Sequence, residues 1–326
     1  MKIVVLDGYT LNPGDLDWSS LFSLTSNPSD CIVYDRTPSE LILERAKEAT
    51  IILTNKTPLT KDTIDQLKNC KYIGVLATGY NVVDLETARE KSIIVTNIPS
   101  YSTNSVAQLT FALLLESITH TTAHHHSVLA GEWSRCKDFS YTLNPLWELA
   151  NKTFGIVGLG AIGKAVGKIA SAFKMNVIFT SRRNYSQEDL SQLDFEAKQV
   201  PLNILLSKSD FISLHCPLTQ ATHKIINSES LKLIRPTTGL INTSRGPLID
   251  QEAVSKALNE NQLAFYATDV LEVEPPPTSN PLFNAKNSLI TPHIAWQTKE
   301  ARNRLLNIAV ENVKAFLNGK CINKVN

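Results

Sequence analysis

The stretch from Thr153 to Arg183 constrains the fold more than any other part of the chain. It opens with a short apolar run, continues with a G-x-G-x-x-G at Gly158, Gly160 and Gly163, and then carries apolar residues at helical spacing. This order predicts a strand, a tight turn, a helix and a second strand. In such a unit the glycines allow a sharp turn, a close backbone approach to a pyrophosphate and tight helix packing, and the pyrophosphate sits on free N–H groups at the start of the helix. The segment therefore predicts a dinucleotide-binding unit.

The first hundred residues alternate short β-branched runs with helical segments, which predicts a parallel sheet with crossover helices. The strands are expected at Lys2–Asp7, Cys31–Asp35, Thr50–Asn55, Tyr72–Ala77 and Ile93–Ile98. The helices between them are expected at Glu40–Glu48, Asp62–Leu67 and Leu85–Glu90. Since 326 residues are many for one core, a second domain is expected to follow.

The rest of the chain repeats the same alternation around the glycine-rich stretch. Further strands are expected at Asp210–Cys216, Gly239–Thr243, Phe265–Val270 and Ser288–Thr291. Helices are expected at Ser105–Ser117, Asn203–Leu206, Ser228–Leu233 and Gln251–Asn259, the first of them buried because it is apolar nearly all round. The C-terminal segment predicts an amphipathic helix that ends at Gly319, and one interpretation is that it packs back on the first domain.

The predicted fold class is α/β, with two Rossmann-like or flavodoxin-like doubly wound parallel sheets and an active-site cleft between them. The expected division is a substrate-binding domain at residues 1–100, completed by 297–326, and a dinucleotide-binding domain at 101–296.

Composition excludes several classes of partner. The formal charge is +1, from 32 basic and 31 acidic residues, which provides no field for nucleic acid or anionic lipid. No apolar run approaches the roughly 18 residues of a membrane span, and the N-terminus has no secretory pattern. The five cysteines are scattered without a C-x-x-C, as is typical of reduced thiols in a cytoplasmic protein.

Residues 120–150 lack a clear period and contain three consecutive histidines, His124 to His126. Sequence neighbours rarely converge on one ion, and no cysteine or carboxylate stands at ligand spacing, so we expect no metal and a solvated or interface helix end instead. Trp133 and Trp147 in this stretch either cover a partner subunit or cap their own domain, and the sequence leaves both open.

Ionisable residues follow three of the predicted strands, where doubly wound sheets collect their ligands. Arg245 follows one strand, Asp269 and Glu274 follow the next, and His293 follows the last. A histidine can give a proton to a carbonyl oxygen as hydride arrives at its carbon, a carboxylate can orient that imidazole, and an arginine can bind a substrate carboxylate through two hydrogen bonds. We assign these roles to His293, Glu274 and Arg245. The alternative is an ordinary Arg245–Glu274 ion pair beside a strand-end histidine.

Three motifs resemble signatures of the D-isomer-specific 2-hydroxyacid dehydrogenases: NTSRGPLID at 242–250, ATDVLEVEPPP at 267–277 and TPHIAWQT at 291–298. Others look like its hydroxypyruvate reductase (glycerate dehydrogenase) branch: TNKTPLT at 54–60, ATGYNVVDLETARE at 77–90, NIPSYSTNSVAQLTFALLLE at 97–116 and HCPLT at 215–219. The resemblance extends over nearly the whole chain, with motifs of both predicted domains in the family's order.

The resemblance implies the same catalytic Arg245, Glu274 and His293, and adds substrate contacts at Asn55, Lys56, Thr78 and Gly79. It implies that Asp269 faces the nicotinamide carboxamide, that the substrate domain contains both chain ends, and that two copies associate through the cofactor domain. The cofactor contacts are expected at Val106, Gly158, Gly160, Ala161, Ile162, Gly163, Ser181, Arg182, Arg183, His215, Pro217, Thr243, Asp269 and Ala295.

The chain departs from the family about 18 positions after the third glycine, where NAD-using members carry an acidic residue. Here Ser181 is followed by Arg182 and Arg183. A carboxylate would bind a ribose 2′-hydroxyl and repel a 2′-phosphate, whereas a serine and two guanidiniums do the opposite. We therefore expect NADP(H) to be preferred, with NAD(H) possible. The alternative is that both arginines are only solvated.

These inferences predict an NADPH-dependent reductase that converts hydroxypyruvate or glyoxylate to the D-2-hydroxy acid. One alternative with the same chemistry is a broader 2-keto acid or keto-sugar-acid reductase. A second is a dinucleotide-sensing binding protein of the same fold.

Overall fold

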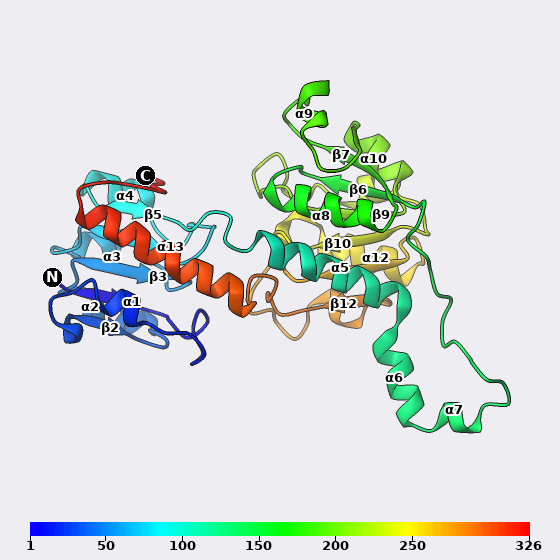
Figure 1. Ribbon diagram of the computed structural model, residues 1–326, viewed down its shortest axis with the longest axis horizontal. Coiled ribbons are helices and arrows are strands. Elements are labelled where there is room, and N and C mark those ends of the chain that lie inside the picture. Colours follow the sequence, from blue (N-terminus) through cyan, green and yellow to red (C-terminus); the bar gives the residue numbers. More distant parts are fainter. The chain divides into compact units, whose positions relative to one another are not determined.

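The computed structural model describes residues 1–326 and divides into two compact units. Unit 1 consists of Met1–Ser102 and Trp296–Asn326, and unit 2 consists of Thr103–Ala295. Each unit is built on one parallel sheet (Figure 1). Both ends of the chain therefore belong to unit 1.

The sheet of unit 1 has five strands in the order β2-β1-β3-β4-β5. The strands are β1 (Ile3–Val5), β2 (Cys31–Val33), β3 (Ile51–Thr54), β4 (Tyr72–Val75) and β5 (Ile94–Thr96). The helices are α1 (Ser19–Phe22), α2 (Ile42–Ala46), α3 (Lys61–Gln66), α4 (Leu85–Glu90) and α13 (Lys299–Leu317), with short 3₁₀ turns at Pro28–Asp30 and Ser39–Leu41. This is a flavodoxin-like order, whose direction reverses between β1 and β3.

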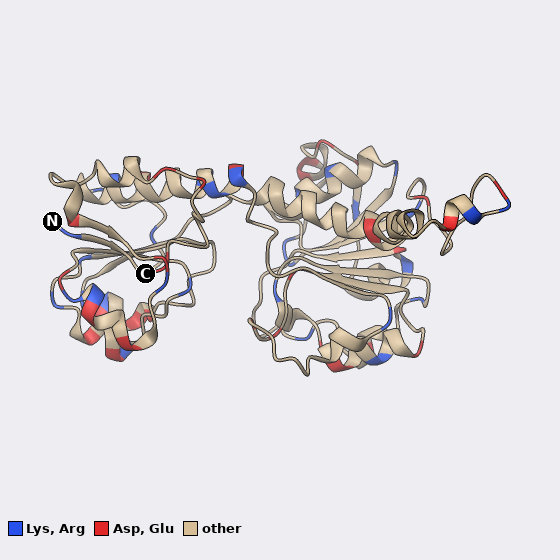
Figure 2. Cartoon of the chain, turned by 90° about the horizontal axis from the view of Figure 1, so that it is seen from below, with Lys and Arg blue, Asp and Glu red and all other residues tan.

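Helices cover both faces of this sheet, because successive strand residues point to opposite sides. Ile3 and Val5 pack with residues of α1 and α13, whereas Val4 packs with residues of α2, α3 and α4. Figure 2 shows the helices above and below the strands. The helix α13 ends before Gly319, which has a φ of +71°, as the sequence predicts.

The sheet of unit 2 has seven strands in the order β12-β11-β10-β9-β6-β7-β8, all parallel. The strands are β6 (Thr153–Val157), β7 (Asn176–Thr180), β8 (Ala197–Gln199), β9 (Phe211–Leu214), β10 (Gly239–Asn242), β11 (Phe265–Thr268) and β12 (Ser288–Ile290). The helices are α5 (Thr103–Thr119), α6 (Thr121–Leu129), α7 (Glu132–Arg135), α8 (Ala161–Ala172), α9 (Gln187–Ser191), α10 (Leu202–Lys208), α11 (Ser228–Leu231) and α12 (Gln251–Asn259), with 3₁₀ turns at Gly246–Leu248 and Pro281–Asn284.

The strand order of unit 2 is the Rossmann order with one added edge strand, and it reverses between β6 and β9. One face packs against α5 and α8 and the other against α10, α11 and α12. The prediction of two doubly wound parallel sheets is confirmed. The predicted order of strand, glycine turn, helix and strand is also confirmed, since β6 is followed by the turn at Gly158, by α8 and by β7.

Several elements differ from the sequence-based expectation. The expected helix at Glu40–Glu48 shortens to α2, because a 3₁₀ turn at Ser39–Leu41 follows Pro38. The elements α9 and β8 were not expected; β8 is an edge strand without a buried residue, so it has no apolar pattern. Most strands also end one or two residues earlier than expected, where their last residues turn into the loops at the sheet edge.

Residues 120–150, here called the arm, contain α6 and α7, which extend away from the sheet of unit 2 (Figure 1). Only Ser127 of α6 is buried, which explains why the sequence shows no helical period there. None of the helices in residues 1–326 has the length and apolar character needed to cross a membrane.

Candidate active site

The carboxyl ends of the parallel strands of unit 2 lie at one edge of its sheet, here called the carboxyl edge. Most of the predicted site residues of this unit follow those ends directly. In chain order, the residues that directly follow β6, β7, β9, β10 and β11 are Gly158, Ser181, His215, Thr243 and Asp269. The sheet therefore brings together residues from a wide span of the sequence.

His293 and Glu274 form the central contact of this edge. The Nδ1 atom of His293 lies 2.6 Å from Oε2 of Glu274, and the two side chains are 29% and 35% exposed. The other carboxylate oxygen of Glu274 accepts a hydrogen bond from the backbone N–H of Leu271 at 2.9 Å. The carboxylate thus fixes the imidazole through Nδ1 and leaves Nε2 for a reacting group.

Asp269 holds the loop that carries His293. Its Oδ1 accepts hydrogen bonds from the Thr291 hydroxyl at 2.6 Å and from the Ile294 N–H at 2.8 Å, and Oδ2 accepts one from the Ala295 N–H at 2.8 Å. The side chain is buried, and this burial raises the pKa of Asp269 against the opposing effect of its hydrogen bonds. The sequence motif located this residue, but its support of the 291–295 loop is visible only in the structure.

Arg245 lies in the loop after β10, on the strand that neighbours β11. It is exposed, and its guanidinium donates a hydrogen bond to the carbonyl of Ser244 at 2.7 Å. Its own carbonyl accepts a hydrogen bond from the side chain of Asn242 at 2.9 Å, which fixes the backbone of the loop. A guanidinium in this position can bind a planar anion through two hydrogen bonds.

The loop from Gly158 to Gly163 has the shape that a dinucleotide pyrophosphate requires. Gly158 has a φ of +102°, and a Cβ there would lie 2.7 Å from the backbone nitrogen of Cys216. A Cβ at Gly163 would lie 2.2 Å from the carbonyl oxygen of Gly158, whereas one at Gly160 would meet nothing within 4 Å. Because no side chain caps the start of α8, which begins at Ala161, its first N–H groups remain free for an anion. The residues present therefore fit the cofactor.

The remaining predicted cofactor residues lie around the same edge. Thr110 joins two of them, because its hydroxyl donates to the Val106 carbonyl at 2.8 Å and lies 2.9 Å from the Thr243 hydroxyl. The Ala295 carbonyl accepts a hydrogen bond from the Ser105 hydroxyl. Burial lowers the pKa of His215 to about 3, so this imidazole is neutral at neutral pH. Ile162 packs beside the buried face of α8, and the Pro217 carbonyl accepts a hydrogen bond from Thr222.

The loop after β7 carries Ser181, Arg182 and Arg183, and three residues that the sequence did not single out surround it. They are Tyr185, Asp189 and Gln199, which contact its backbone or its arginines. The sequence gives little indication of their role. Gln199, for example, ends β8, a strand that has no apolar pattern.

In unit 1 the predicted substrate residues follow two neighbouring strands. Asn55 and Lys56 follow β3, and Thr78 and Gly79 follow β4 at a distance of a few residues. The Thr78 hydroxyl donates a hydrogen bond to the Ile98 carbonyl at 2.9 Å. The Thr78 carbonyl accepts one from the side-chain amide of Asn97 at 2.8 Å. The loops thus lie at the carboxyl edge of the sheet of unit 1.

The carboxylate of Asp7 organises the first of these loops. It accepts hydrogen bonds from three successive backbone N–H groups, those of Asn55 at 2.8 Å, Lys56 at 2.5 Å and Thr57 at 2.8 Å. This role is visible only in the structure. The position of Asp7 at the end of the first predicted strand could have marked the residue as a candidate.

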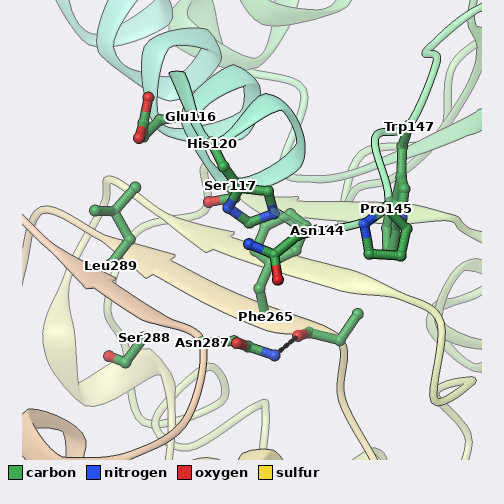
Figure 3. Close-up of a pocket in the computed structure, with 11 residues that line it drawn as sticks. Glu116, Ser117, His120, Asn144, Pro145, Trp147, Phe265, Asn287, Ser288 and Leu289 are labelled. Carbon is green, nitrogen blue, oxygen red and sulfur yellow. Dashed lines mark hydrogen bonds between the residues drawn. The ribbon is translucent and has the colours of Figure 1, made fainter. Parts of the chain in front are cut away.

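A hollow of about 360 Å³ lies at the opposite edge of the unit 2 sheet (Figure 3). Its floor includes Phe265 and Ser288, the first residues of β11 and β12, and the arm contributes Asn144, Pro145 and Trp147 to its wall. The hollow is therefore remote from the strand ends that carry His293. It lies at the base of the arm, between the end of α5 and the strand starts.

The histidines of the arm have structural contacts. The Nδ1 atom of His124 lies 2.8 Å from the carbonyl of His120, and its Nε2 accepts the N–H of Leu143 at 3.1 Å. Residues 1–326 contain no group of three or more His, Cys, Asp or Glu side chains placed to hold a metal ion.

Comparison with known sequences gives consistent matches. A family model described as "D-isomer specific 2-hydroxyacid dehydrogenase, NAD binding domain" matches residues 111–295. A hydroxypyruvate reductase of Blautia hydrogenotrophica is 46% identical, with 100% of each chain covered. A glycerate dehydrogenase of Methylorubrum extorquens is 38% identical over 89% of each chain, and a glyoxylate reductase of Aeropyrum pernix is 37% identical over 88% of this chain and 85% of its own.

Solved structures share the whole fold. An acyclic imino acid reductase in complex with NADPH and D-Arg has a TM-score of 0.85 at 30% identity, with 100% of each chain covered. A D-lactate dehydrogenase of Aquifex aeolicus, complexed with NAD and lactic acid, has a TM-score of 0.82 at 28% identity, covering 97% of this chain and 96% of its own. These similar structures hold NADPH in one case and NAD in the other.

Proposed function

The chain belongs to the D-isomer-specific 2-hydroxyacid dehydrogenase family, and from this we propose that it reduces hydroxypyruvate or glyoxylate to the D-2-hydroxy acid with NADPH as the preferred donor. It is an oxidoreductase of that family, with an NAD(P)-binding domain. The names of its relatives support reduction of a small 2-keto acid. The observation that carries the proposal is the His293–Glu274 pair at the carboxyl edge that also bears the glycine loop.

Each member of the catalytic set has one task. The reduced nicotinamide, when bound, supplies the hydride that attacks the carbonyl carbon of the substrate. His293 gives a proton from Nε2 to the carbonyl oxygen as that oxygen gains negative charge, and Glu274 keeps the ring oriented through Nδ1. Arg245 binds the substrate carboxylate and polarises the carbonyl. The product is the 2-hydroxy acid, and His293 is left deprotonated.

Residues of unit 1 complete the substrate contacts in this proposal. The backbone at Thr78 and Gly79 offers N–H groups to the carboxylate, and the turn with Asn55 and Lys56 lines the other side of the substrate. The turn has little freedom, because Asp7 binds three of its N–H groups. In this proposal the turn therefore presents Asn55 and Lys56 to the substrate in one arrangement.

The loop after β7 supports the proposed cofactor preference. The exposed guanidinium of Arg182 and the hydroxyl of Ser181 suit a 2′-phosphate, and no carboxylate follows β7 directly to bind a 2′-hydroxyl. We therefore expect NADPH to be used with a higher kcat/KM than NADH. Replacing Arg182 by Ala should raise the KM for NADPH much more than that for NADH.

A substrate panel run with both cofactors tests this function. Hydroxypyruvate, glyoxylate, pyruvate and a keto-sugar acid would each be assayed with NADPH and with NADH. The proposal requires the highest kcat/KM for hydroxypyruvate or glyoxylate with NADPH. A higher value with NADH would contradict the cofactor preference, and no oxidation of either cofactor across the panel would favour a binding role over catalysis.

We also propose that two copies associate through the arm. Three large apolar side chains of the arm are exposed: Leu129 by 71%, Trp133 by 52% and Phe139 by 91% of their surface. Exposed apolar residues that gather in one segment are typical of an interaction surface. A second copy that packs on the arm would cover these residues and the hollow at its base. We further propose a cytoplasmic location, which the five scattered cysteines without a C-x-x-C favour.

Light scattering coupled to gel filtration tests this association. The wild-type chain should elute with the mass of a dimer, and a Leu129→Glu, Phe139→Ser variant should elute as a monomer. Phe283→Ser, which changes another exposed aromatic residue of unit 2, should remain dimeric. A monomeric wild-type chain would contradict the proposed dimer.

A further inference from the structure

One side-chain amide fixes the backbone of the loop after β7. The Nε2 atom of Gln199 donates hydrogen bonds to the carbonyls of Ser181 at 3.3 Å and Arg183 at 2.8 Å, and its Oε1 accepts one from the N–H of Tyr185 at 2.9 Å. The Tyr185 hydroxyl in turn donates to the carbonyl of Leu159 at 3.0 Å. The loop is therefore tied both to β8 and to the glycine loop.

The two arginines of this loop have different surroundings. The guanidinium of Arg183 forms an ion pair with Asp189 and lies 5.0 Å from the ring centre of Tyr185. Arg182 is exposed and forms no hydrogen bond or ion pair within residues 1–326. One guanidinium is thus already neutralised by a carboxylate, and the other is available to an anion.

Asp189 is held in place independently of Arg183. It stands in the first turn of α9, where its Oδ2 accepts hydrogen bonds from the N–H of Ser186 at 2.9 Å and from its hydroxyl at 3.1 Å. The backbone hydrogen bond from Ser186 is the main cause that lowers the pKa of Asp189, so the group is a carboxylate at neutral pH. Its side chain is 26% exposed, compared with 65% for that of Arg183.

We propose that Asp189 is a specificity-determining residue that weakens the discrimination between NADPH and NADH by competing with the 2′-phosphate for Arg183. The inference rests on the proposed cofactor site at Gly158–Gly163 and Ser181–Arg183. Arg182 and Ser181 bind the phosphate directly, whereas Arg183 contributes only to the extent that it leaves Asp189. NADH has a hydroxyl at that position and gains nothing from a released guanidinium, so Asp189 affects the two cofactors unequally.

The test is Asp189→Asn, with the dissociation constants of NADPH and NADH measured by titration calorimetry. The asparagine oxygen can still accept the hydrogen bond from Ser186, so the turn and the melting temperature should be retained. We expect the dissociation constant of NADPH to fall about fivefold, the size of effect typical of an exposed ion pair. That of NADH should stay within about twofold.

Two controls separate competition from a general change of charge. Asp194→Asn removes an equal charge from an exposed aspartate of the same unit, which pairs with Lys168 at 2.6 Å, and should leave the NADPH to NADH ratio unchanged. Arg183→Ala should weaken NADPH binding slightly in the wild-type background and several-fold more in the Asp189→Asn background.

The outcomes are distinct. Weaker NADPH binding by Asp189→Asn would show that Asp189 orients Arg183 towards the phosphate, and this result would overturn the proposal, as would an equal effect of Asp194→Asn. Equal affinity of the wild-type chain for both cofactors would contradict the proposed NADPH preference alone, because the ratio can still shift in the variant. Failure of the wild-type chain to bind either dinucleotide would overturn both.

Discussion

At the scale of single residues, His293 is held by its backbone as well as by its side chain. It has a φ of +56°, in the left-handed region that is uncommon for residues other than glycine, and its N–H contacts the carbonyls of Asp269 at 2.9 Å and Thr291 at 3.0 Å. The carboxylate of Asp269 fixes the two N–H groups that follow. The direction of the ring is thus set by the loop, and Glu274 sets its rotation.

Removing the charge of Glu274 should slow the reaction. In Glu274→Gln the amide oxygen can still accept the Nδ1–H hydrogen bond from His293, but it places no negative charge beside the imidazole that gives up the proton. We expect kcat/KM for reduction at neutral pH, measured by steady-state kinetics, to fall about tenfold to a hundredfold. Cofactor binding should be unchanged.

Glu272→Gln is the matched control for this variant. Glu272 lies two positions away and interacts with the side chain of Gln251 at 3.1 Å. It should keep the kcat/KM of the wild-type chain. An unchanged kcat/KM in Glu274→Gln would contradict the role of the carboxylate, and an equal fall in Glu272→Gln would indicate a general effect of lost charge.

At the scale of elements, the turn between β3 and α3 depends on a carboxylate from the end of β1. Asp7 lies 48 to 50 positions from the N–H groups that it binds. The side chain of Asn55 adds a hydrogen bond to the Thr10 hydroxyl at 3.2 Å, which joins the same two segments. The shape of the proposed substrate loop therefore belongs to two strand ends together.

Asp7→Ala should loosen this turn and weaken substrate binding. With no acceptor for its three N–H groups, the turn no longer holds Asn55 and Lys56 in one arrangement, and we expect the KM for the keto acid to rise about tenfold. The dissociation constant of NADPH should stay constant, because the glycine loop belongs to unit 2. Steady-state kinetics and calorimetry measure the two quantities.

Asp17→Ala is the control for Asp7→Ala, since Asp17 also accepts a backbone hydrogen bond in unit 1, from Ser19 at 2.8 Å, but does not contact the turn. It should lower the melting temperature without changing the KM. An equal rise of KM in both variants would indicate a general loss of stability and would count against the role of Asp7.

At the scale of the whole molecule, the elements that sequence could predict are those with a regular apolar pattern. The strands β6, β9, β10 and β11 are buried along almost their whole length, and their short apolar runs predicted them. The edge strand β8 and the solvated helix α6 bury almost nothing, so neither produced a pattern. Buried elements can thus be predicted from the sequence, whereas exposed elements cannot.

The candidate site divides in the same way. Arg245, Glu274 and His293 could be found because each follows a predicted strand, and the family motifs covered them. Reading strand ends in unit 1 would also have singled out Asp7 as a candidate, but the roles of Asp7 and Asp189 depend on contacts that no local pattern records. Sequence therefore predicts the candidate catalytic residues more readily than the groups that hold them in position.

An ion pair joins the C-terminal helix α13 to the N-terminal segment of unit 1, and it leads to a prediction about the stability of the fold. Arg302, at the start of α13, is 7% exposed and forms two hydrogen bonds with Asp15, at 2.6 and 2.7 Å, and a third with the Leu11 carbonyl at 3.0 Å. The hydrogen bond from Arg302 is the main cause that lowers the pKa of Asp15. Asp15→Asn would leave a buried guanidinium without its counterion, which is destabilising.

The effect of Asp15→Asn should depend on pH in a defined direction. Because the pKa of Asp15 is lower in the folded chain than the unfolded value of about 3.9, the ion pair stabilises the fold fully above that value and is lost as the pH falls through the folded one. At pH 7 we expect the melting temperature of the variant to be lower by at least about 2 °C, and the difference should shrink below about pH 4. Asp65→Asn, which breaks the exposed Lys91–Asp65 pair, should change the melting temperature very little at either pH. A difference for Asp15→Asn that stays constant from pH 7 to pH 3 would mean that the loss of stability does not come from the ion pair with Arg302.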